Sequence, residues 1–352
     1  MKKTIIHAIA ITLLLTSCKK NELTNELPTI DNTKGVYILN EGNFMKSNSS
    51  LDLYSYDSNK VYSDVFYSSN NRSLGDVAND IFIFENKAFI VVNNSHKLEI
   101  ISTLNNKSLG TIQLPNKSPR RVYILNSTTG YITNWNENSV TVFNPTTYEI
   151  IKDKITVDNF PEGIAFANGK LYVCNSGLGK SNTVSVINIS TNTEIKKIKV
   201  GFQPYDISVD SDGDLIVCCR GFMDWTDPSK DIEGGIYSIN SSLDSAVAKI
   251  NLPLSTFGHP EKMVVSNYGF GIVKTINGIL KFDTKINQII NQNFINNYSA
   301  YSIGIDDSKS KIFVGDPKNY ITNGKVYIYN FSGNLNDSIT VGLLPNSFAF
   351  LK

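Results

Sequence analysis

The chain has 352 residues, of which 41% are hydrophobic, 11% aromatic and only 18% charged. A chain of this length can bury a large core in one domain or in two. Its formal net charge of +1 removes the attraction by which basic proteins bind nucleic acid or anionic membrane surfaces, so we expect no nucleic-acid partner.

The N-terminus has the pattern of a bacterial lipoprotein signal. Two lysines precede an apolar run of eleven residues, Ile5 to Leu15, which is too short to span a bilayer but suits a signal-peptide core. The run ends in Leu-Thr-Ser-Cys, which resembles a lipobox with Cys18 as the acylated residue. The sequence therefore predicts a signal peptide over residues 1–17 and a lipid anchor on Cys18. An ordinary secretory signal with an incidental cysteine is the alternative.

Residues 18–34 comprise the lipidated cysteine and a polar stretch that we interpret as a flexible tether. Lys19 follows the cysteine where an inner-membrane retention signal would carry Asp, which favours the outer membrane. The next residues only weakly resemble the acidic tether signal of surface lipoproteins. We expect an outer-membrane, lipid-anchored protein exposed at the cell surface, with the inner leaflet as the alternative.

The rest of the chain, residues 35–352, repeats one strand pattern. A short apolar strand recurs at spacings of 41, 42, 43, 56, 40 and 45 residues, beginning at Ala78, Pro119, Pro161, Pro204, Pro260, Ala300 and Pro345. A turn and three further strands follow each of the first six copies. Four short strands per unit, joined by Asn-Gly and Asp-Gly turns, predict an all-β fold of propeller blades.

The two ends of this region complement each other. Gly35-Val-Tyr-Ile-Leu-Asn matches a second strand with no first strand before it, and Pro345-Asn-Ser-Phe-Ala-Phe-Leu matches a first strand with nothing after it. We therefore predict a seven-bladed β-propeller that is closed by pairing the C-terminal strand with the N-terminal blade. Closure removes the free sheet edges that would otherwise favour aggregation.

In such a propeller, the loops that enter first strands share one face with the loops that join second to third strands. We call this the long-loop face. The residue after each strand opening gives one ring on it: Asn79, Arg120, Glu162, Tyr205, Glu261, Tyr301 and Asn346. The last residue of each second strand gives another: Asn40, Asn93, Asn134, Asn175, Cys219, Lys274 and Asp316. Asn also tolerates the left-handed backbone conformation found in turns. The residues of this second ring could therefore serve either to form the turns or to bind a ligand.

The spacing of 56 residues reflects an insertion, Arg220 to Gly234, which carries Phe222, Met223 and Trp225. Long loops on rigid scaffolds are often functional, and exposed aromatic side chains there favour a partner. Packing of Trp135 and Trp225 beneath their own loops is the alternative. The predicted ligand-binding residues share this aromatic, amide-rich face: Asn43, Phe44, Asn79, Asn93, His96, Arg120, Asn134, Trp135, Phe160, Glu162, Asn175, Tyr205, Arg220, Trp225, Lys274, Tyr301, Asp316 and Tyr320.

We expect no catalytic residues, no metal site and no cofactor. The chain has no G-x-S-x-G nucleophile context and no phosphate-binding Walker loop. Three cysteines remain after lipidation, which does not match a disulfide framework. An oxygen cage for calcium, made by Glu162, Glu261, Asn134, Asn175 and Asp316 as in lactonase-like propellers, is the enzymatic alternative.

Several segments resemble a known family. Gly35-VYILNEGNF, Ser50-LDLYSYD, Leu74-GDVANDIFIF and Ala88-FIVVNNS are similar to the start of a Bacteroidetes lipoprotein family of seven-bladed propellers. Its best understood members bind cobalamin at the cell surface. The later strands resemble the wider YncE-like repeat family. The resemblance implies a non-enzymatic protein that captures cobalamin or a related corrinoid and passes it to a TonB-dependent outer-membrane transporter.

Three other functions stay open. A related lipoprotein could bind a ferric siderophore, haem or a glycan for another transporter of this type. The chain could instead be a calcium-dependent, lactonase-like hydrolase. It could also be an interaction scaffold that binds no small molecule.

Replacing Cys18 by Ala tests the lipid anchor. Without the thiol no acyl chain can be attached, and the protein should move from the membrane fraction to the soluble fraction. Fractionation of cells followed by immunoblotting measures this. Persistent membrane association of the variant would contradict the lipobox assignment.

Overall fold

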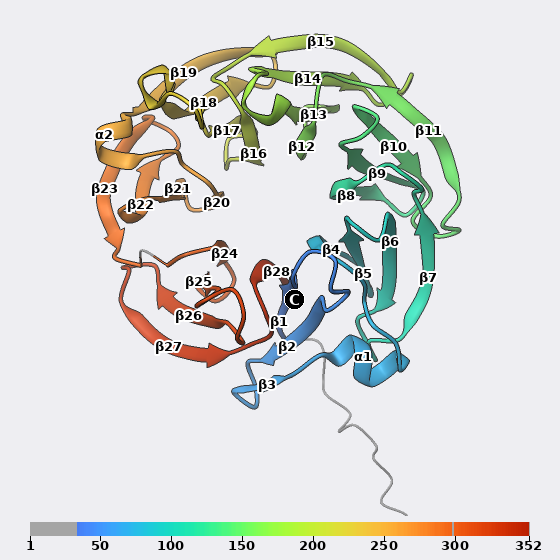
Figure 1. The fold of residues 1–352 in the computed structure, drawn as a ribbon. Helices are drawn as coiled ribbons and strands as arrows, with labels where there is room; N and C mark the ends of the chain where they lie inside the picture. The colour runs from blue at the N-terminus through green and yellow to red at the C-terminus, as the bar shows by residue number, and fades with distance from the viewer. Residues whose placement is uncertain (1–33, 298, 352) are drawn as a thin grey trace, which may run out of the picture. The chain divides into compact units, whose positions relative to one another are not determined.

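The computed structural model describes residues 34–297 and 299–351, and the predicted signal peptide, Cys18 and most of the tether lie outside them. The described chain forms seven four-stranded antiparallel sheets arranged around a central channel (Figure 1). This confirms the predicted all-β, seven-bladed propeller. No helix in the described part of the chain is long and apolar enough to cross a membrane.

Each blade follows the same order from the channel outwards. Blade 1 consists of β28 (Pro345–Leu351), β1 (Gly35–Asn40), β2 (Ser50–Ser55) and β3 (Lys60–Tyr62). Blade 2 consists of β4 (Ala78–Phe84), β5 (Lys87–Val92), β6 (Lys97–Ser102) and β7 (Ser108–Gln113). Blade 3 consists of β8 (Pro119–Asn126), β9 (Thr129–Asn134), β10 (Ser139–Phe143) and β11 (Ile150–Thr156). Blade 4 consists of β12 (Pro161–Ala167), β13 (Lys170–Asn175), β14 (Thr183–Asn188) and β15 (Thr193–Lys199).

The remaining blades repeat this order. Blade 5 consists of β16 (Pro204–Val209), β17 (Leu215–Cys219), β18 (Gly234–Asn240) and β19 (Ser245–Leu252). Blade 6 consists of β20 (Met263–Ser266), β21 (Phe270–Thr275), β22 (Gly278–Asp283) and β23 (Gln288–Ile295). Blade 7 consists of β24 (Ser302–Asp306), β25 (Lys311–Asp316), β26 (Lys325–Asn330) and β27 (Leu335–Thr340). Short helices occur in loops: α1 (Val65–Asn70), α2 (Leu254–Phe257), η1 (Gly177–Gly179) and η2 (Pro228–Lys230).

The ring closes as the two chain ends predicted. β28 pairs antiparallel with β1, from Gly35 opposite Leu351 to Asn40 opposite Pro345, with a register shift beside Asn40. The C-terminal and N-terminal strands therefore lie side by side in one blade (Figure 1).

Two inner strands are shorter than the sequence pattern predicts. β20 begins at Met263 rather than at Pro260, and β24 begins at Ser302 rather than at Ala300. Backbone hydrogen bonds extend the pairing beyond each strand, because the Glu261 N–H donates to the Lys274 carbonyl and the Tyr301 N–H donates to the Gly315 carbonyl. The inner-strand position is thus kept in both blades, although regular pairing starts later.

The hydrophobic core lies between neighbouring blades. Between blades 4 and 5, for example, Tyr172 and Val184 pack with Leu215 and Val217, all with no exposed surface. Similar clusters fill the interfaces between other neighbouring blades. Alternating side chains of adjacent sheets interdigitate there, so each blade depends on its neighbours for burial.

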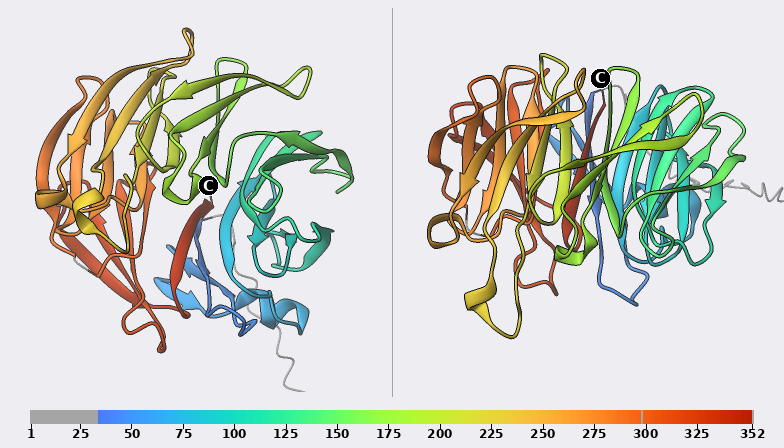
Figure 2. Two further views of the ribbon diagram at one scale, coloured as in Figure 1. Left: turned by 45° about the horizontal axis from the view of Figure 1, so that its top comes forward. Right: turned by 90° about the horizontal axis from the view of Figure 1, so that it is seen from above.

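The long-loop face is formed as predicted. The loop after each second strand lies against the loop that enters the inner strand of its own blade, as where the Arg220 N–H donates to the Gln203 carbonyl and the Trp135 N–H to the Ser118 carbonyl. In the right-hand view of Figure 2, the blue loop after β1 and the gold loop after β17 project from the same side of the ring. Tight hairpins form the opposite side, which we call the hairpin face.

Deleting residues 346–352 tests the closure. It removes almost all of β28, which leaves β1 unpaired on one edge and exposes two blade interfaces, so we expect the free energy of unfolding to fall by more than about 5 kcal/mol. Denaturant unfolding followed by circular dichroism measures this change. Leu335→Ala on outer strand β27, where the side chain is exposed, is the control and should change stability by less than about 0.5 kcal/mol. An unchanged unfolding curve for the deletion would contradict the closure.

Candidate functional site

An ion pair between two inner strands lies at the mouth of the channel on the long-loop face. Arg120 on β8 donates from Nε and Nη2 to the two carboxylate oxygens of Glu162 on β12, at 3.1 and 3.2 Å. Both residues are buried, with Glu162 only 1% exposed. Burial disfavours the charge on Arg120, but the adjacent carboxylate outweighs it and keeps the pKa of Arg120 above its ordinary value.

Aromatic side chains surround this pair. The guanidinium of Arg120 lies 3.9 Å from the ring centroid of Trp135, and Trp135 donates from Nε1 to Glu162 at 3.1 Å. Phe160 packs edge-on against Trp135 with the ring centroids 5.8 Å apart. The hydroxyl of Tyr205 lies 3.4 Å from Nη2 of Arg120. Five residues predicted from three different blades thus form one pre-organised cluster.

A second cluster joins blades 7 and 1 at the same mouth. Tyr301 donates from its hydroxyl to the carboxylate of Glu41 at 2.5 Å, and its ring contacts that of Tyr320 edge-on. Asn43 donates to the backbone carbonyl of Tyr320 at 3.0 Å. Burial, followed by the charge and hydrogen bond of Glu41, raises the pKa of Tyr301. Tyr301 therefore remains a neutral phenol at physiological pH.

Asn residues at the ends of second strands bond to their own blade or to the next one. Asn134 donates to the Thr141 hydroxyl at 2.9 Å, and Asn175 donates to the Ser185 hydroxyl at 2.8 Å. Both are fully buried. Asn93 donates to the backbone carbonyl of Pro119 at 2.9 Å. These contacts favour a structural role for the three amides.

Other predicted residues support loops or pair with a neighbour. His96 accepts a hydrogen bond on Nδ1 from the backbone of Ser118, which holds the loop into β8. Lys274 pairs with Glu261 at 2.6 Å, and Asp316 pairs with Lys318 at 2.7 Å. In the inner ring, Asn346 donates to the backbone carbonyl of Asn79 at 3.2 Å, across the boundary between blades 1 and 2.

Exposed apolar side chains lie on several loops of the long-loop face. Trp225 is 88% exposed in the loop after β17, so the alternative in which it packs beneath its own loop does not hold. Phe44 is 61% and Tyr320 55% exposed in the loops after β1 and β25. The same kind of loop exposes further apolar side chains: Met45, Leu178, Met223, Ile232, Ile276 and Ile321. Five of the seven blades contribute to this apolar rim.

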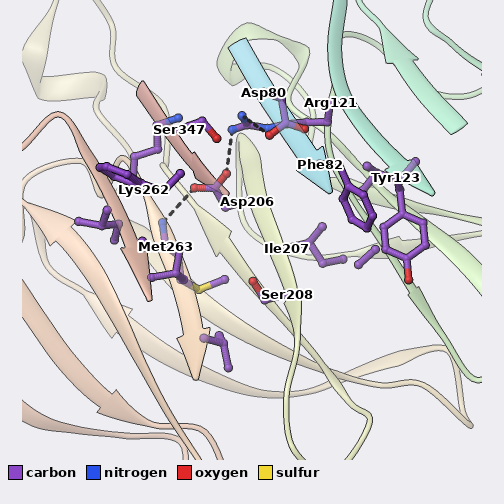
Figure 3. A pocket seen from close by; sticks show the side chains of 18 of the residues that line it. Asp80, Phe82, Arg121, Tyr123, Asp206, Ile207, Ser208, Lys262, Met263 and Ser347 are labelled. Atoms are coloured by element: carbon purple, nitrogen blue, oxygen red, sulfur yellow. Dashed lines mark hydrogen bonds and ion pairs between the residues drawn. The ribbon is translucent and has the colours of Figure 1, made fainter. Parts of the chain in front are cut away.

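The channel beneath the mouth holds a cavity of about 450 Å³ that all seven inner strands line. Its end toward the long-loop face carries charges, where Arg121 pairs with Asp206 at 3.1 Å and lies 3.8 Å from Asp80 (Figure 3). Lys262 lies at the same end. We call these four residues the charged belt. Apolar side chains such as Phe82, Tyr123, Phe166 and Phe350 line the part nearer the hairpin face.

Burial sets the electrostatics of the belt. Burial in the channel wall raises the pKa of Asp80, and the charge of Arg121 only partly opposes this rise. Burial also disfavours the charge on Arg121, but Asp80 and Asp206 outweigh it and raise its pKa. The guanidinium is thus permanently charged and shared between two carboxylates.

The belt was not predicted as a set from the sequence. Its members are the second residues after the strand openings, one residue further along the inner strands than the predicted ring. The same spacing that located Arg120 and Tyr205 would have located Arg121 and Asp206. Glu41, the partner of Tyr301, was also missed, although it directly follows β1.

Within the described residues, no group of three or more His, Cys, Asp or Glu side chains is placed to hold a metal ion. Cys174, Cys218 and Cys219 are free thiols with no exposed surface. Burial raises the pKa of all three thiols, so they are protonated at neutral pH and act as small apolar side chains.

Comparison with known sequences identifies the family. A family profile described as "Domain of unknown function (DUF5074)" matches residues 34–221, more than half of the chain. The chain belongs to the DUF5074 family. No curated protein matches it in sequence.

Solved structures share the fold of this DUF5074 protein. A candidate 6-phosphogluconolactonase from Bacteroides fragilis has a TM-score of 0.69 at 11% identity, over 92% of this chain and 100% of that one. A quinoprotein alcohol dehydrogenase-like protein from Bacteroides thetaiotaomicron has a TM-score of 0.66 at 15% identity, over 91% and 79%. Hydrazine synthase from Kuenenia stuttgartiensis has a TM-score of 0.65 at 16% identity, over 77% and 88%. Identities this low show the propeller fold alone.

Glu162→Gln tests how strongly the channel mouth is pre-organised. The substitution leaves the buried Arg120 without its carboxylate, so we expect the free energy of unfolding to fall by about 3 kcal/mol. Glu261→Gln is the matched control, because Glu261 holds the same inner-strand position but its side chain is 40% exposed in its pair with Lys274. The control substitution should lower the free energy of unfolding by less than about 1 kcal/mol. If denaturant unfolding gave the same loss of unfolding free energy for both variants, the buried Arg120–Glu162 pair would not be what organises the mouth.

Proposed function

We propose that this DUF5074 protein is a non-enzymatic binding lipoprotein that holds cobalamin or a related corrinoid on its long-loop face. In this proposal Cys18 anchors it in the outer membrane at the cell surface, and the ligand passes to a TonB-dependent transporter. The observation that carries the proposal is the apolar rim around a pre-organised channel mouth, with Trp225 88% exposed.

The composition of the mouth and rim suits such a ligand. A corrinoid is a large disc with amide side chains, so it requires flat apolar contacts together with hydrogen-bond donors and acceptors. Trp225, Phe44 and Tyr320 supply exposed aromatic surface from three different blades. The fixed groups of Arg120, Glu162 and Tyr301 at the mouth supply polar contacts whose geometry is already set before binding. Pre-organisation lowers the entropic cost of binding.

The calcium-dependent hydrolase has weaker support. Such an enzyme requires carboxylates that converge on a metal ion. Here Glu162 pairs with Arg120, Glu261 with Lys274, and Asp316 with Lys318. Each carboxylate already has a cation within the protein, and releasing it would cost electrostatic free energy.

Titration of residues 19–352 with cyanocobalamin by calorimetry tests the proposal. We expect saturable one-to-one binding at micromolar affinity or tighter. No heat and an unchanged melting temperature would contradict corrinoid binding. Titrations with a ferric siderophore, haem and a glycan would then distinguish another transported ligand from a scaffold that binds none of them.

Trp225→Ala tests the place of binding. If the indole is an anchor, the variant should lose about 1–3 kcal/mol of binding free energy in the same titration. Tyr268→Ala is the matched control, because Tyr268 is 68% exposed in the hairpin between β20 and β21 on the hairpin face. It should bind cyanocobalamin like the wild type. Equal affinities for all three proteins would place the ligand elsewhere than the long-loop face.

A further inference from the structure

Four cations converge on one tyrosine at the channel mouth. Arg120 contacts the Tyr205 hydroxyl at 3.4 Å. Arg121, Arg220 and Lys262 lie 5.8, 5.1 and 5.4 Å from the centroid of the same ring. The negative face of an aromatic ring attracts cations, so Tyr205 helps to hold these like charges near one another.

Two of these cations are neutralised within the protein and two are not. Arg120 pairs with Glu162, and Arg121 pairs with Asp206 and Asp80. Across residues 34–297 and 299–351, Arg220 and Lys262 form no ion pair, and their side-chain nitrogens donate no hydrogen bond. The Nε of Arg220 is buried without an acceptor. A buried donor without an acceptor costs free energy, so the Arg220 side chain has hydrogen-bonding capacity that the described residues leave unused.

The nearby carboxylates have other partners. Asp231 accepts from the backbone of Asp224 and lies 3.4 Å from Nε2 of His259. Asp206 accepts from the backbone of Met263 in addition to Arg121. Glu261, next to Lys262 in the chain, pairs with Lys274. Arg220 therefore has no carboxylate partner at the mouth, and Lys262 makes no ion pair there, although the Asp80 carboxylate of the charged belt is close enough to interact with it electrostatically.

We propose that Arg220 and Lys262 form a subsite for a phosphate group of the ligand, held above the channel beside Tyr205. A guanidinium and an ammonium group together suit the oxygens of a phosphate, because one provides a planar fork of donors and the other a compact charge. The subsite thus selects a ligand with an anion at its edge and its apolar body on the rim.

Inorganic phosphate tests this subsite without assuming any larger ligand. We expect phosphate to raise the melting temperature of the wild type more than chloride does at the same ionic strength, because it binds the folded state. In the double variant Arg220→Gln, Lys262→Gln this difference should vanish. Lys180→Gln, an exposed lysine on the same face, is the matched control and should respond like the wild type. No phosphate response in the wild type, or equal responses in all three proteins, would overturn the subsite.

A second comparison rests on the proposed function and identifies the source of the phosphate. Cyanocobalamin carries a phosphodiester in its nucleotide loop, whereas dicyanocobinamide lacks that loop. We expect the wild type to bind cyanocobalamin about tenfold more tightly or better, and the double variant to lose this preference. If Arg220→Gln prevents folding, the single variant Lys262→Gln is measured instead and should show a weaker preference for cyanocobalamin than the wild type. Equal affinities in the wild type would overturn the phosphodiester assignment.

The two experiments fail separately. If neither corrinoid binds but the phosphate response depends on Arg220 and Lys262, the subsite stands and the corrinoid proposal falls. If corrinoids bind but phosphate has no effect in any protein, the proposed function stands and the subsite falls.

Discussion

The pairing of the C-terminal strand with the N-terminal blade is the constraint on which the rest of this structure depends. β28 pairs with β1 from Gly35 opposite Leu351 onward, and this backbone contact joins the first blade to the last. Every blade buries its apolar faces only against its neighbours, so a ring opened at the closure would expose the facing apolar surfaces of blades 7 and 1 to water. Closure also completes the channel, because Asn346 on β28 reaches across to the Asn79 carbonyl on β4.

A closed ring brings residues that are distant in sequence to one opening. Arg120, Glu162 and Tyr205 come from three successive blades and meet at the channel mouth. Burying an ion pair such as Arg120–Glu162 adds little net stability, but breaking it is costly, so the pair fixes geometry more than it contributes free energy. The buried groups of the mouth and the exposed side chains of the rim thus have different physical roles: the former set positions, and the latter provide apolar area.

Electrostatics divides the channel into two levels. In the charged belt, two carboxylates share Arg121 with Lys262 close by, so the charges there are balanced. At the mouth, Arg220 forms no ion pair within the described chain, and its guanidinium lies near the same Tyr205 ring as the Lys262 ammonium group. Paired and unpaired cations thus lie near one another where the inner strands begin, an arrangement that the net charge of the chain does not reveal.

The sequence by itself determined the blades, their number and the closure, because alternating strands and tight turns depend on residues close together in the chain. It also located the insertion that carries Trp225, since an added loop lengthens the repeat. Only the tertiary structure decided which predicted residues act together. Asn134 and Asn175 each end a second strand, a position that the sequence pattern assigned to the long-loop face. Their amides are nevertheless buried against hydroxyls of the next strand. The belt of Asp80, Arg121, Asp206 and Lys262, and the pairing of Tyr301 with Glu41, join residues from separate blades. Such contacts depend on how the blades pack, which no local spacing along the chain encodes.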